Sequence, residues 1–288
     1  MADKHVDEFT GTETTGHEWD GIRELNNPLP RWWLWTFYAC ILWAIGYWIA
    51  MPAWPLISSY TGGMLGYSQR ATVAADLAGA VAEREVYAGK LETASLEQIR
   101  TDPELLNFAL AGGRSAYAVN CSQCHGAGAA GSTGYPNLND DDWLWGGTLQ
   151  DIEQTILYGI RSGHDEARVN EMPAFGRDEL LQADEIRAVA EYVLSLSGRA
   201  TDAAAVAAGS AVFEEQCVAC HMEGGKGNRE LGAPSLADGI WLYGGEKADI
   251  VASVRNSRAG VMPHWQDRLS GTTIKQLAIY VHSLGGGE

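Results

Sequence analysis

Cys121-Ser122-Gln123-Cys124-His125 recurs later in the chain as Cys217-Val218-Ala219-Cys220-His221. Further matching segments follow each copy in the same order: Pro136-Asn137-Leu138 with Pro234-Ser235-Leu236, Trp143-Leu144-Trp145-Gly146-Gly147 with Trp241-Leu242-Tyr243-Gly244-Gly245, Arg161 with Arg255, and Met172-Pro173 with Met262-Pro263. Such self-similarity indicates two copies of one structural unit. The sequence therefore predicts tandem modules at residues 105–199 and 202–288, joined by a short link.

Each copy also begins and ends with a run that favours a helix. Apolar residues of the closing runs fall at i, i+3, i+4 and i+7, a helical period: Ile186, Val189, Ala190 and Val193 in the first copy, and Ile274, Leu277, Ala278 and Val281 in the second. The opening runs carry an aromatic residue, Tyr117 or Phe213, and the closing runs carry Tyr192 or Tyr280. We expect a mainly α fold in which the first and last helices of each module cross at these aromatic residues.

The repeated Cys-x-x-Cys-His motif is the attachment sequence for c-type haem, because its two thiols can add to the haem vinyl groups and its histidine can bind the iron. A thioredoxin-like redox pair would need a βαβ setting, which the pattern does not predict. A zinc site would crowd three ligands into five residues. We therefore predict two covalently bound haems c. Their attachment residues are Cys121, Cys124, Cys217 and Cys220, and their proximal iron ligands are His125 and His221.

The sixth iron ligand must come from elsewhere in the chain. Met172 and Met262 occur at matching places in the two copies, each in a loop before the closing helix. The proline after each methionine restricts the backbone and keeps the residue out of a helix. We predict that Met172 serves the first module and Met262 the second, with His164 and His264 as the alternatives.

Four further residues are candidates for the walls of the haem pockets. A guanidinium fork suits a partly desolvated carboxylate such as a haem propionate. The alternative is that the arginines are solvated loop charges. The four candidates are Arg161, Arg255, Trp143 and Trp241.

An uncharged segment precedes the modules. No charged side chain occurs between Arg31 and Arg70, and twenty helical residues from Trp32 span about 30 Å, the thickness of a bilayer core. Tryptophans at both ends suit the two headgroup levels. The sequence thus predicts a tail at residues 1–30, a membrane anchor at 31–57 that contains Cys40 as a packing residue, and a helical linker at 58–104.

The positive-inside rule gives the orientation of this anchor. Arg23 and Arg31 lie on its N-terminal side, whereas the nearest basic residue on the other side is Arg70. We expect a single-pass protein of the bacterial inner membrane, with a cytoplasmic N-terminus and periplasmic haem domains. Haem attachment to this motif outside the inner membrane agrees with that orientation.

The charge of the chain restricts its partners. A formal net charge of -17 disfavours nucleic acid and favours a partner with a basic face. Residues 105–199 carry 13 acidic and 6 basic side chains, whereas residues 202–288 carry 10 and 7. The run of Asp140, Asp141 and Asp142 is therefore a candidate docking surface for a basic donor, although a solvated face is the alternative.

The chain resembles a known family, the membrane-bound dihaem cytochrome c subunit of cbb3-type cytochrome c oxidases (CcoP/FixP). The resemblance rests on Asp20-Gly21-Ile22, on Asn27-Pro28-Leu29-Pro30-Arg31-Trp32-Trp33, on Tyr47-Trp48, on Pro52-Ala53-Trp54-Pro55, and on the two modules. It implies two tandem class I-like cytochrome c domains. It also implies that electrons from a basic or membrane-bound cytochrome c pass through these haems to a monohaem cytochrome subunit and on to the catalytic haem-copper subunit.

No oxygen-reducing site is expected in this chain, because an iron with both axial positions filled suits electron transfer. Two other functions remain open at this point. A dihaem peroxidase would need one haem with a displaceable sixth ligand. A membrane-tethered electron shuttle, or a cytochrome serving a periplasmic dehydrogenase, could use the same modules.

Overall fold

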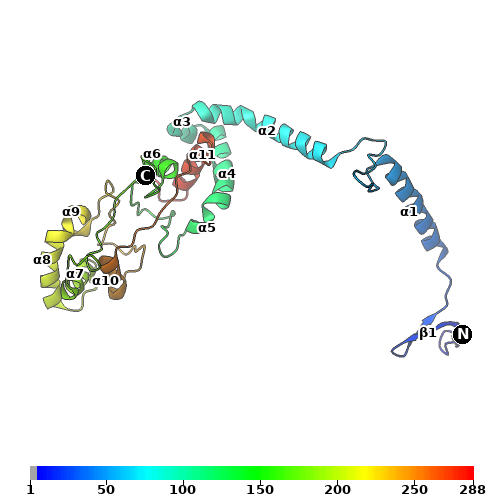
Figure 1. Cartoon of the computed structure of the whole chain (residues 1–288), viewed down its shortest axis with the longest axis horizontal. Helices are drawn as coiled ribbons and strands as arrows, with labels where there is room; N and C mark the ends of the chain where they lie inside the picture. Colours follow the sequence, from blue (N-terminus) through cyan, green and yellow to red (C-terminus); the bar gives the residue numbers. More distant parts are fainter. Residues whose placement is uncertain (1–4) are drawn as a thin grey trace. The chain divides into compact units, whose positions relative to one another are not determined.

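The computed structural model describes residues 5–288 and divides into two units, the first ending at Glu83 and the second spanning Arg84–Glu288 (Figure 1). The first unit contains the strands β1 (Thr14–Trp19) and β2 (Ile22–Leu25) and the helix α1 (Arg31–Ala50). The second unit contains both copies of the Cys-x-x-Cys-His motif. Eleven α-helices among the described residues confirm the predicted mainly α fold.

The strands β1 and β2 form a hairpin within the acidic segment that precedes α1. Trp19 pairs with Ile22 across a two-residue turn, and both turn residues, Asp20 and Gly21, have positive φ angles of 53° and 82°. An Asp-Gly pair is well suited to such a turn, because glycine carries no Cβ and aspartate tolerates the left-handed region. The predicted tail therefore has a structure that its composition alone does not indicate.

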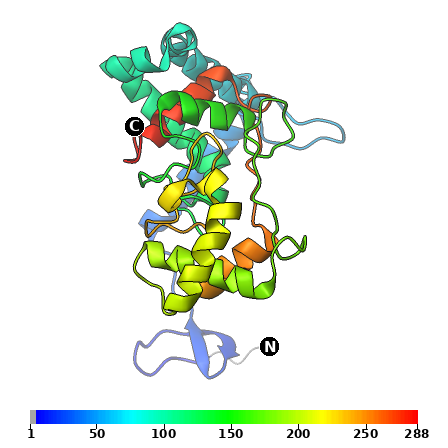
Figure 2. The same cartoon turned by 90° about the vertical axis from the view of Figure 1, so that its left-hand side faces the viewer.

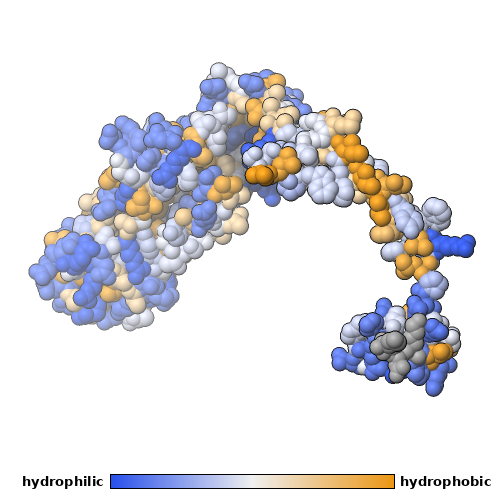
Figure 3. Space-filling view, turned by 45° about the vertical axis from the view of Figure 1, so that its right-hand side comes forward, coloured by the Kyte–Doolittle hydropathy of each residue, from blue (hydrophilic) through white to orange (hydrophobic). Residues whose placement is uncertain are grey.

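Helix α1 begins at Arg31, directly after Pro30, and ends at Ala50, where Met51 and Pro52 leave the helical conformation. It is apolar on all sides and none of its residues is buried. The helix has 20 residues and contains an 18-residue window with a mean hydropathy of 1.4, so it is long and apolar enough to cross a membrane. Figure 3 shows hydrophobic residues gathered along the part of the chain that contains α1. An all-round apolar surface that the described chain leaves largely exposed is what lipid would cover.

Three helices lead from the anchor to the first motif: α2 (Gln69–Thr93), α3 (Leu96–Thr101) and α4 (Pro103–Asn120). Ser95 and Gln98 form a reciprocal capping box at the start of α3. Asp102 ends α3 and caps α4 by accepting hydrogen bonds from the first amides, and Pro103 occupies the first turn, where its missing N–H costs nothing. These caps fix a sharp corner before the motif helix.

The second unit has two helical lobes. Lobe 1 (residues 84–160 and 262–288) contains α4, the short motif helix α5 (Ser122–His125), α6 (Leu149–Tyr158) and α11 (Gly271–His282). Lobe 2 (residues 172–256) contains α7 (Ala183–Leu196), α8 (Ala203–Gln216), α9 (Val218–His221), the 3-10 turn η1 (Glu223–Gly225) and α10 (Lys247–Asn256). Each lobe buries its own apolar core.

Helix packing in the lobes does not follow the order of the two sequence copies. The opening helix of the first copy, α4, packs against α11, the closing helix of the second copy, and α7 packs against α8. Two long segments, residues 159–172 and 257–263, run between the lobes (Figure 2). Each lobe is therefore assembled from parts of both predicted modules, and lobe 2 is inserted within lobe 1 rather than following it.

Glycine and aromatic residues allow the helices to cross closely in both lobes. A Cβ on Gly113 of α4 would meet Gln276 and Tyr280 of α11, and a Cβ on Gly209 of α8 would meet Ala188 of α7. Beside these crossings, the Tyr117 and Tyr280 rings are 5.5 Å apart and the Tyr192 and Phe213 rings 4.9 Å apart. The predicted aromatic crossings are present, but each one joins the two sequence copies.

The link between α7 and α8 shows why the second lobe folds in this way. Glu191 of α7 is fully buried and accepts hydrogen bonds from the amide and the hydroxyl of Thr201, while Lys247 of α10 donates to it at 2.5 Å. These bonds hold the pKa of Glu191 well below its ordinary value, at about 2, with the Lys247 hydrogen bond as the largest cause. The residues predicted to separate two modules thus close a hairpin inside one lobe.

Candidate haem sites

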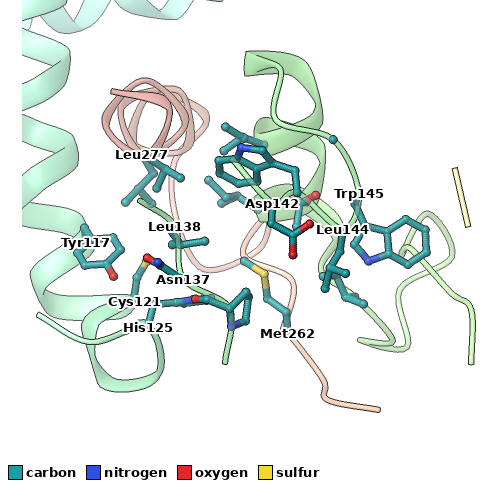
Figure 4. A pocket seen from close by; sticks show the side chains of 18 residues that line it. Tyr117, Cys121, His125, Asn137, Leu138, Asp142, Leu144, Trp145, Met262 and Leu277 are labelled. Carbon is teal, nitrogen blue, oxygen red and sulfur yellow. The ribbon is translucent and has the colours of Figure 1, made fainter. Parts of the chain in front are cut away.

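A pocket in lobe 1 brings together the first motif and a methionine from the second copy. Cys121, His125 and Met262 all line it, and the side chains of His125 and Met262 project into it from different elements (Figure 4). The remaining wall is largely apolar and includes Leu138, Trp145 and residues of α6 and α11. Met262 reaches this pocket because its backbone pairs with Ile160 in both directions, at 3.0 Å each.

The two proximal histidines have the same second partner. His125 Nδ1 lies 3.1 Å from the carbonyl oxygen of Pro136, and His221 Nδ1 lies 3.0 Å from that of Pro234. A carbonyl oxygen can only accept a hydrogen bond, so Nδ1 carries the proton of the ring. Nε2 therefore keeps a free electron pair. Burial lowers the pKa of both histidines below the ordinary value, which favours this neutral form. Both rings are therefore prepared to bind a metal through Nε2.

Lobe 2 contains the corresponding parts for the second motif. Cys217 contacts the core cluster of α7, α8 and α10, and Met172 packs against the adjoining cluster around Phe175. The two clusters share partly buried side chains of α8 and α10, namely Val212, Val251 and Val254. Met172 therefore lies in the same lobe as Cys217 and His221. The predicted assignment of Met172 to the first motif and Met262 to the second does not match this arrangement, because the closing segments are exchanged.

The first cysteine of each motif is poorly suited to redox exchange in this fold. Burial raises the pKa of the Cys121 and Cys217 thiols to about 11. A thiol with a raised pKa is rarely ionised and reacts slowly in disulfide exchange. None of the cysteines in residues 5–288 forms a disulfide, and no cluster of three His, Cys, Asp or Glu side chains in that range is placed to hold a metal ion. The donors thus fit thioether attachment of haem better than the thioredoxin or zinc alternatives.

The tryptophans of the predicted pocket walls differ between the lobes. Trp143 lines the lobe 1 pocket and donates its indole N–H to the carbonyl of Gly286. The buried indole nitrogen of Trp241 has no partner within the described chain. An unsatisfied buried donor beside the second motif fits a carboxylate acceptor such as a haem propionate.

The predicted arginines occupy unlike environments. Arg161 donates to two backbone carbonyls, those of Gly260 and Asn170. Arg255 lies in the last turn of helix α10, and its exposed side chain packs over Gly176. The role of either arginine as a haem contact remains a prediction.

The alternative sixth ligands lie beside each other. The His164 and His264 rings are 5.5 Å apart, and Tyr158 lies 4.9 Å from His164. Neither histidine lines the lobe 1 pocket, whereas Met262 does. The structure therefore favours the methionine over His264 for the lobe 1 site.

Two arginines that the sequence analysis overlooked extend the repeat. Arg168 lies over the Trp145 ring at 5.5 Å, and its guanidinium pairs with Asp151 at 3.1 Å. Arg258 lies over the matching Tyr243 ring at 5.7 Å. Each stands four residues before a candidate methionine ligand, so an Arg-x-x-x-Met-Pro motif shared by the two copies would have identified them.

The acidic run near Trp143 is only partly a solvated surface. Asp141 is exposed, but Asp142 lines the lobe 1 pocket. Burial raises the pKa of Asp142 to about 6, and the neighbouring charges of Asp238 and Asp140 contribute. The negative charge that a partner could meet is therefore concentrated on Asp141 and the half-buried Asp140.

Two Cys-x-x-Cys-His sites on a helical fold, behind a helix that can span a membrane, define a membrane-anchored c-type cytochrome. Two family models match the chain accordingly. The model for the N-terminal domain of cytochrome oxidase-cbb3, FixP, matches residues 11–58. The model for cytochrome c oxidase, cbb3-type, subunit III matches residues 108–193 and again residues 204–281.

Curated relatives agree with these matches along the whole chain. The chain is 57% identical over 290 residues to the cbb3-type cytochrome c oxidase subunit FixP of Bradyrhizobium sp. (strain ORS 278), covering all of both proteins. It is 57% identical over 284 residues to the FixP subunit of Azorhizobium caulinodans, covering 98% of this chain and 96% of the relative. It is 52% identical over 295 residues to the CcoP subunit of Azospirillum brasilense, again covering all of both. The chain belongs to the cbb3-type cytochrome c oxidase subunit III family.

Proposed function

We propose that this chain is the dihaem electron-transfer subunit of a cbb3-type cytochrome c oxidase and that it holds two covalently bound haems c. The observation that carries the proposal is the repeated site: two partly buried cysteine-histidine motifs in which a proline carbonyl fixes the histidine tautomer. When bound, haem supplies an iron that alternates between the ferric and ferrous states. The chain supplies the attachment, the axial ligands and the apolar surroundings.

The geometry supports an exchanged set of ligands. His125 and Met262 would hold the haem attached to Cys121 and Cys124, because both line the lobe 1 pocket. His221 and Met172 would hold the haem attached to Cys217 and Cys220, because Met172 packs within lobe 2. Methionine ligation raises the potential of a haem, and two filled axial positions suit it to electron transfer rather than oxygen chemistry.

The relatives' names as oxidase subunits support specific partners. Electrons would enter from a soluble or membrane-bound cytochrome c with a basic face, and the negative balance of residues 105–199 supports that choice. They would leave for a monohaem cytochrome subunit and then for the catalytic haem-copper subunit. In this proposal the chain conducts electrons and does not itself reduce oxygen.

The membrane arrangement is part of the same proposal. Helix α1 would cross the bacterial inner membrane once, with residues 1–30 in the cytoplasm and both lobes in the periplasm. Arg31 at the first position of α1 supports this orientation, as does Arg23, although Arg23 is paired with Glu18 at 2.7 Å. Basic residues count in the positive-inside rule even where acidic neighbours are present.

Purification of the chain from native membranes tests this function. In a mild detergent, the 31.1 kDa chain should co-purify with a haem-copper subunit in one haem-stained complex and contain two haems per chain. A Cys121→Ser, Cys124→Ser variant should retain one haem. Migration of the haem-loaded chain apart from any haem-copper subunit, or with a periplasmic dehydrogenase, would contradict the proposal.

A further inference from the structure

Arg161 lies where the two segments that connect the lobes pass each other. Its Nε donates to the carbonyl of Gly260 at 2.6 Å, and its Nη1 donates to the carbonyl of Asn170 at 2.8 Å. Gly260 belongs to the segment that returns to lobe 1, and Asn170 belongs to the segment that leads into lobe 2. One guanidinium therefore binds both connecting segments.

The two acceptors have the same position relative to the candidate ligands. Gly260 stands two residues before Met262, and Asn170 stands two residues before Met172. Hydrogen bonds from a charged donor are stronger than neutral ones, and the planar fork of arginine fixes the angle between its two acceptors. Arg161 thus restrains the backbone close to both methionines at once.

The backbone of Arg161 indicates that this arrangement is specific. Its φ angle is 52°, a left-handed conformation that side-chain-bearing residues adopt rarely. Its amide donates to the carbonyl of Arg168, which closes a loop within the segment 159–172 that contains both residues. Strained residues of this kind persist where the surrounding contacts require them, and they cluster at functional sites.

Arg255 provides a comparison within the same chain. Both arginines follow the tryptophan motif of their copy, but Arg161 lies beyond the end of α6, whereas Arg255 lies in the last turn of the matching helix α10 with an exposed side chain. Within residues 5–288, the Arg255 guanidinium donates no hydrogen bond, whereas Arg161 makes two. The structure therefore gives different environments to two arginines that follow the tryptophan motif in the two copies.

We propose that Arg161 is a positioning residue that holds the sixth ligands of both haems in place by joining the segments that carry them. The inference rests on the proposed function, because it requires Met172 and Met262 to bind iron. It differs from a role in binding a haem propionate, since it acts on the methionine segments. Loss of Arg161 should consequently affect both haems, although each motif lies in a different lobe.

The test compares Arg161→Gln with Arg255→Gln in the haem-loaded full chain. Ferrous haem binds carbon monoxide only where its sixth position opens, and the near-infrared band of ferric haem reports an intact methionine ligand. Arg161→Gln should increase the carbon monoxide-reactive fraction of both haems roughly tenfold, the loss expected for a hydrogen bond to a charged group. It should weaken the near-infrared band of both. Arg255→Gln should leave the near-infrared band of both haems unchanged, because even a propionate contact from Arg255 would not act on the methionine segments.

If Arg161→Gln does not retain two haems, Arg161→Lys is used in its place to test the positioning role. A lysine ammonium keeps the charge but cannot present a planar fork to two carbonyls. Carbon monoxide reactivity should then increase at one haem or at both. Reactivity equal to that of the unaltered protein in Arg161→Lys, or in a folded Arg161→Gln, overturns the inference.

Two further outcomes separate the possible failures. A change in the potential of a single haem in Arg161→Gln, with both near-infrared bands intact, would assign Arg161 to a propionate and overturn the positioning role. Met172→His and Met262→His test the ligands themselves. If neither changes a haem spectrum, the proposed ligand set fails. If both change it while Arg161→Gln does not, only the positioning role fails.

Discussion

Gly113→Ala should destabilise lobe 1, because α4 and α11 approach too closely for a methyl group. The added Cβ would lie 2.6 Å from the Cβ of Tyr280 and 2.9 Å from the carbonyl carbon of Gln276, and it would be closer still to the Gln276 carbonyl oxygen. An ordinary contact needs at least about 3.4 Å, so the helices must separate by more than about 0.8 Å. Backbone atoms of α11 form the obstacle, and a change of rotamer cannot remove it.

The expected cost follows from these contacts. Overpacking of this kind costs about 1–3 kcal/mol, and alanine recovers about 0.5–1 kcal/mol by favouring the helix more than glycine does. Central values of the two terms leave a net loss of about 1–2 kcal/mol, which corresponds to a decrease of roughly 2–8 °C in the midpoint of thermal unfolding for a unit of this size. Circular dichroism of the haem-loaded protein measures that midpoint.

Gly89→Ala is the matched control for this substitution. Gly89 also lies in a helix, α2, but nothing lies within 4 Å of the Cβ that alanine would add. Its unfolding midpoint should stay the same or rise slightly. In Gly113→Ala, the haem on Cys121 should also become more reactive to carbon monoxide, because Met262 precedes the displaced helix. An unchanged midpoint, or a disturbance confined to the haem on Cys217, would refute the packing of α4 on α11.

Three further predictions concern other parts of the second unit. Met172→His should convert the haem held by His221 to bis-histidine ligation, which electron paramagnetic resonance detects, and a change at the other haem would contradict the exchanged ligands. Glu191→Gln should make the stability of the protein less dependent on pH in acid. The pKa of the Glu191 carboxyl falls from 4.5 to about 2 in the fold, so its charge stabilises the folded protein above pH 4.5, and this stabilisation is lost as the pH falls through 2. An unchanged acid-unfolding curve would show that Glu191 does not contribute to acid stability. Neutralising Asp140 and Asp141 together should slow association with a basic cytochrome c at low salt and reduce its salt dependence, as stopped-flow measurements would show. Equal rates at low ionic strength would exclude this surface.

The sequence predicts well those features that depend on local chemistry. The uncharged run from Trp32 corresponds to α1, because length and composition alone make a helix suited to a bilayer. The repeated motifs correspond to matching short helices at Ser122–His125 and Val218–His221. Proline carbonyls beside both histidines occur at repeated positions, Pro136 and Pro234, whose importance only the folded structure reveals.

Pairing between the two copies could not be predicted in this way. A repeat identifies which segments are alike, but alike segments can pack with either copy, because their contact surfaces are similar. The family model likewise matches residues 108–193 and 204–281 in chain order, whereas α4 packs with α11 and α7 with α8.

One signal in the sequence did favour the exchanged packing. Six residues, 197–202, join α7 to α8, and connections of this length usually join antiparallel helices that pack together. The segments that precede α7 and α11 are longer and can cross between lobes. The inequality of Arg161 and Arg255 also had a signal, because Arg161 stands 18 residues after Trp143 whereas Arg255 stands 14 residues after Trp241.

The identity of the sixth ligand in each lobe decides whether the two copies exchange their methionine ligands. A structure of the haem-loaded protein, with the irons located by their anomalous scattering, would show which sulfur binds each iron. We predict that the iron of the haem on Cys121 and Cys124 lies between His125 and Met262. An iron bound by His125 and Met172 would contradict it.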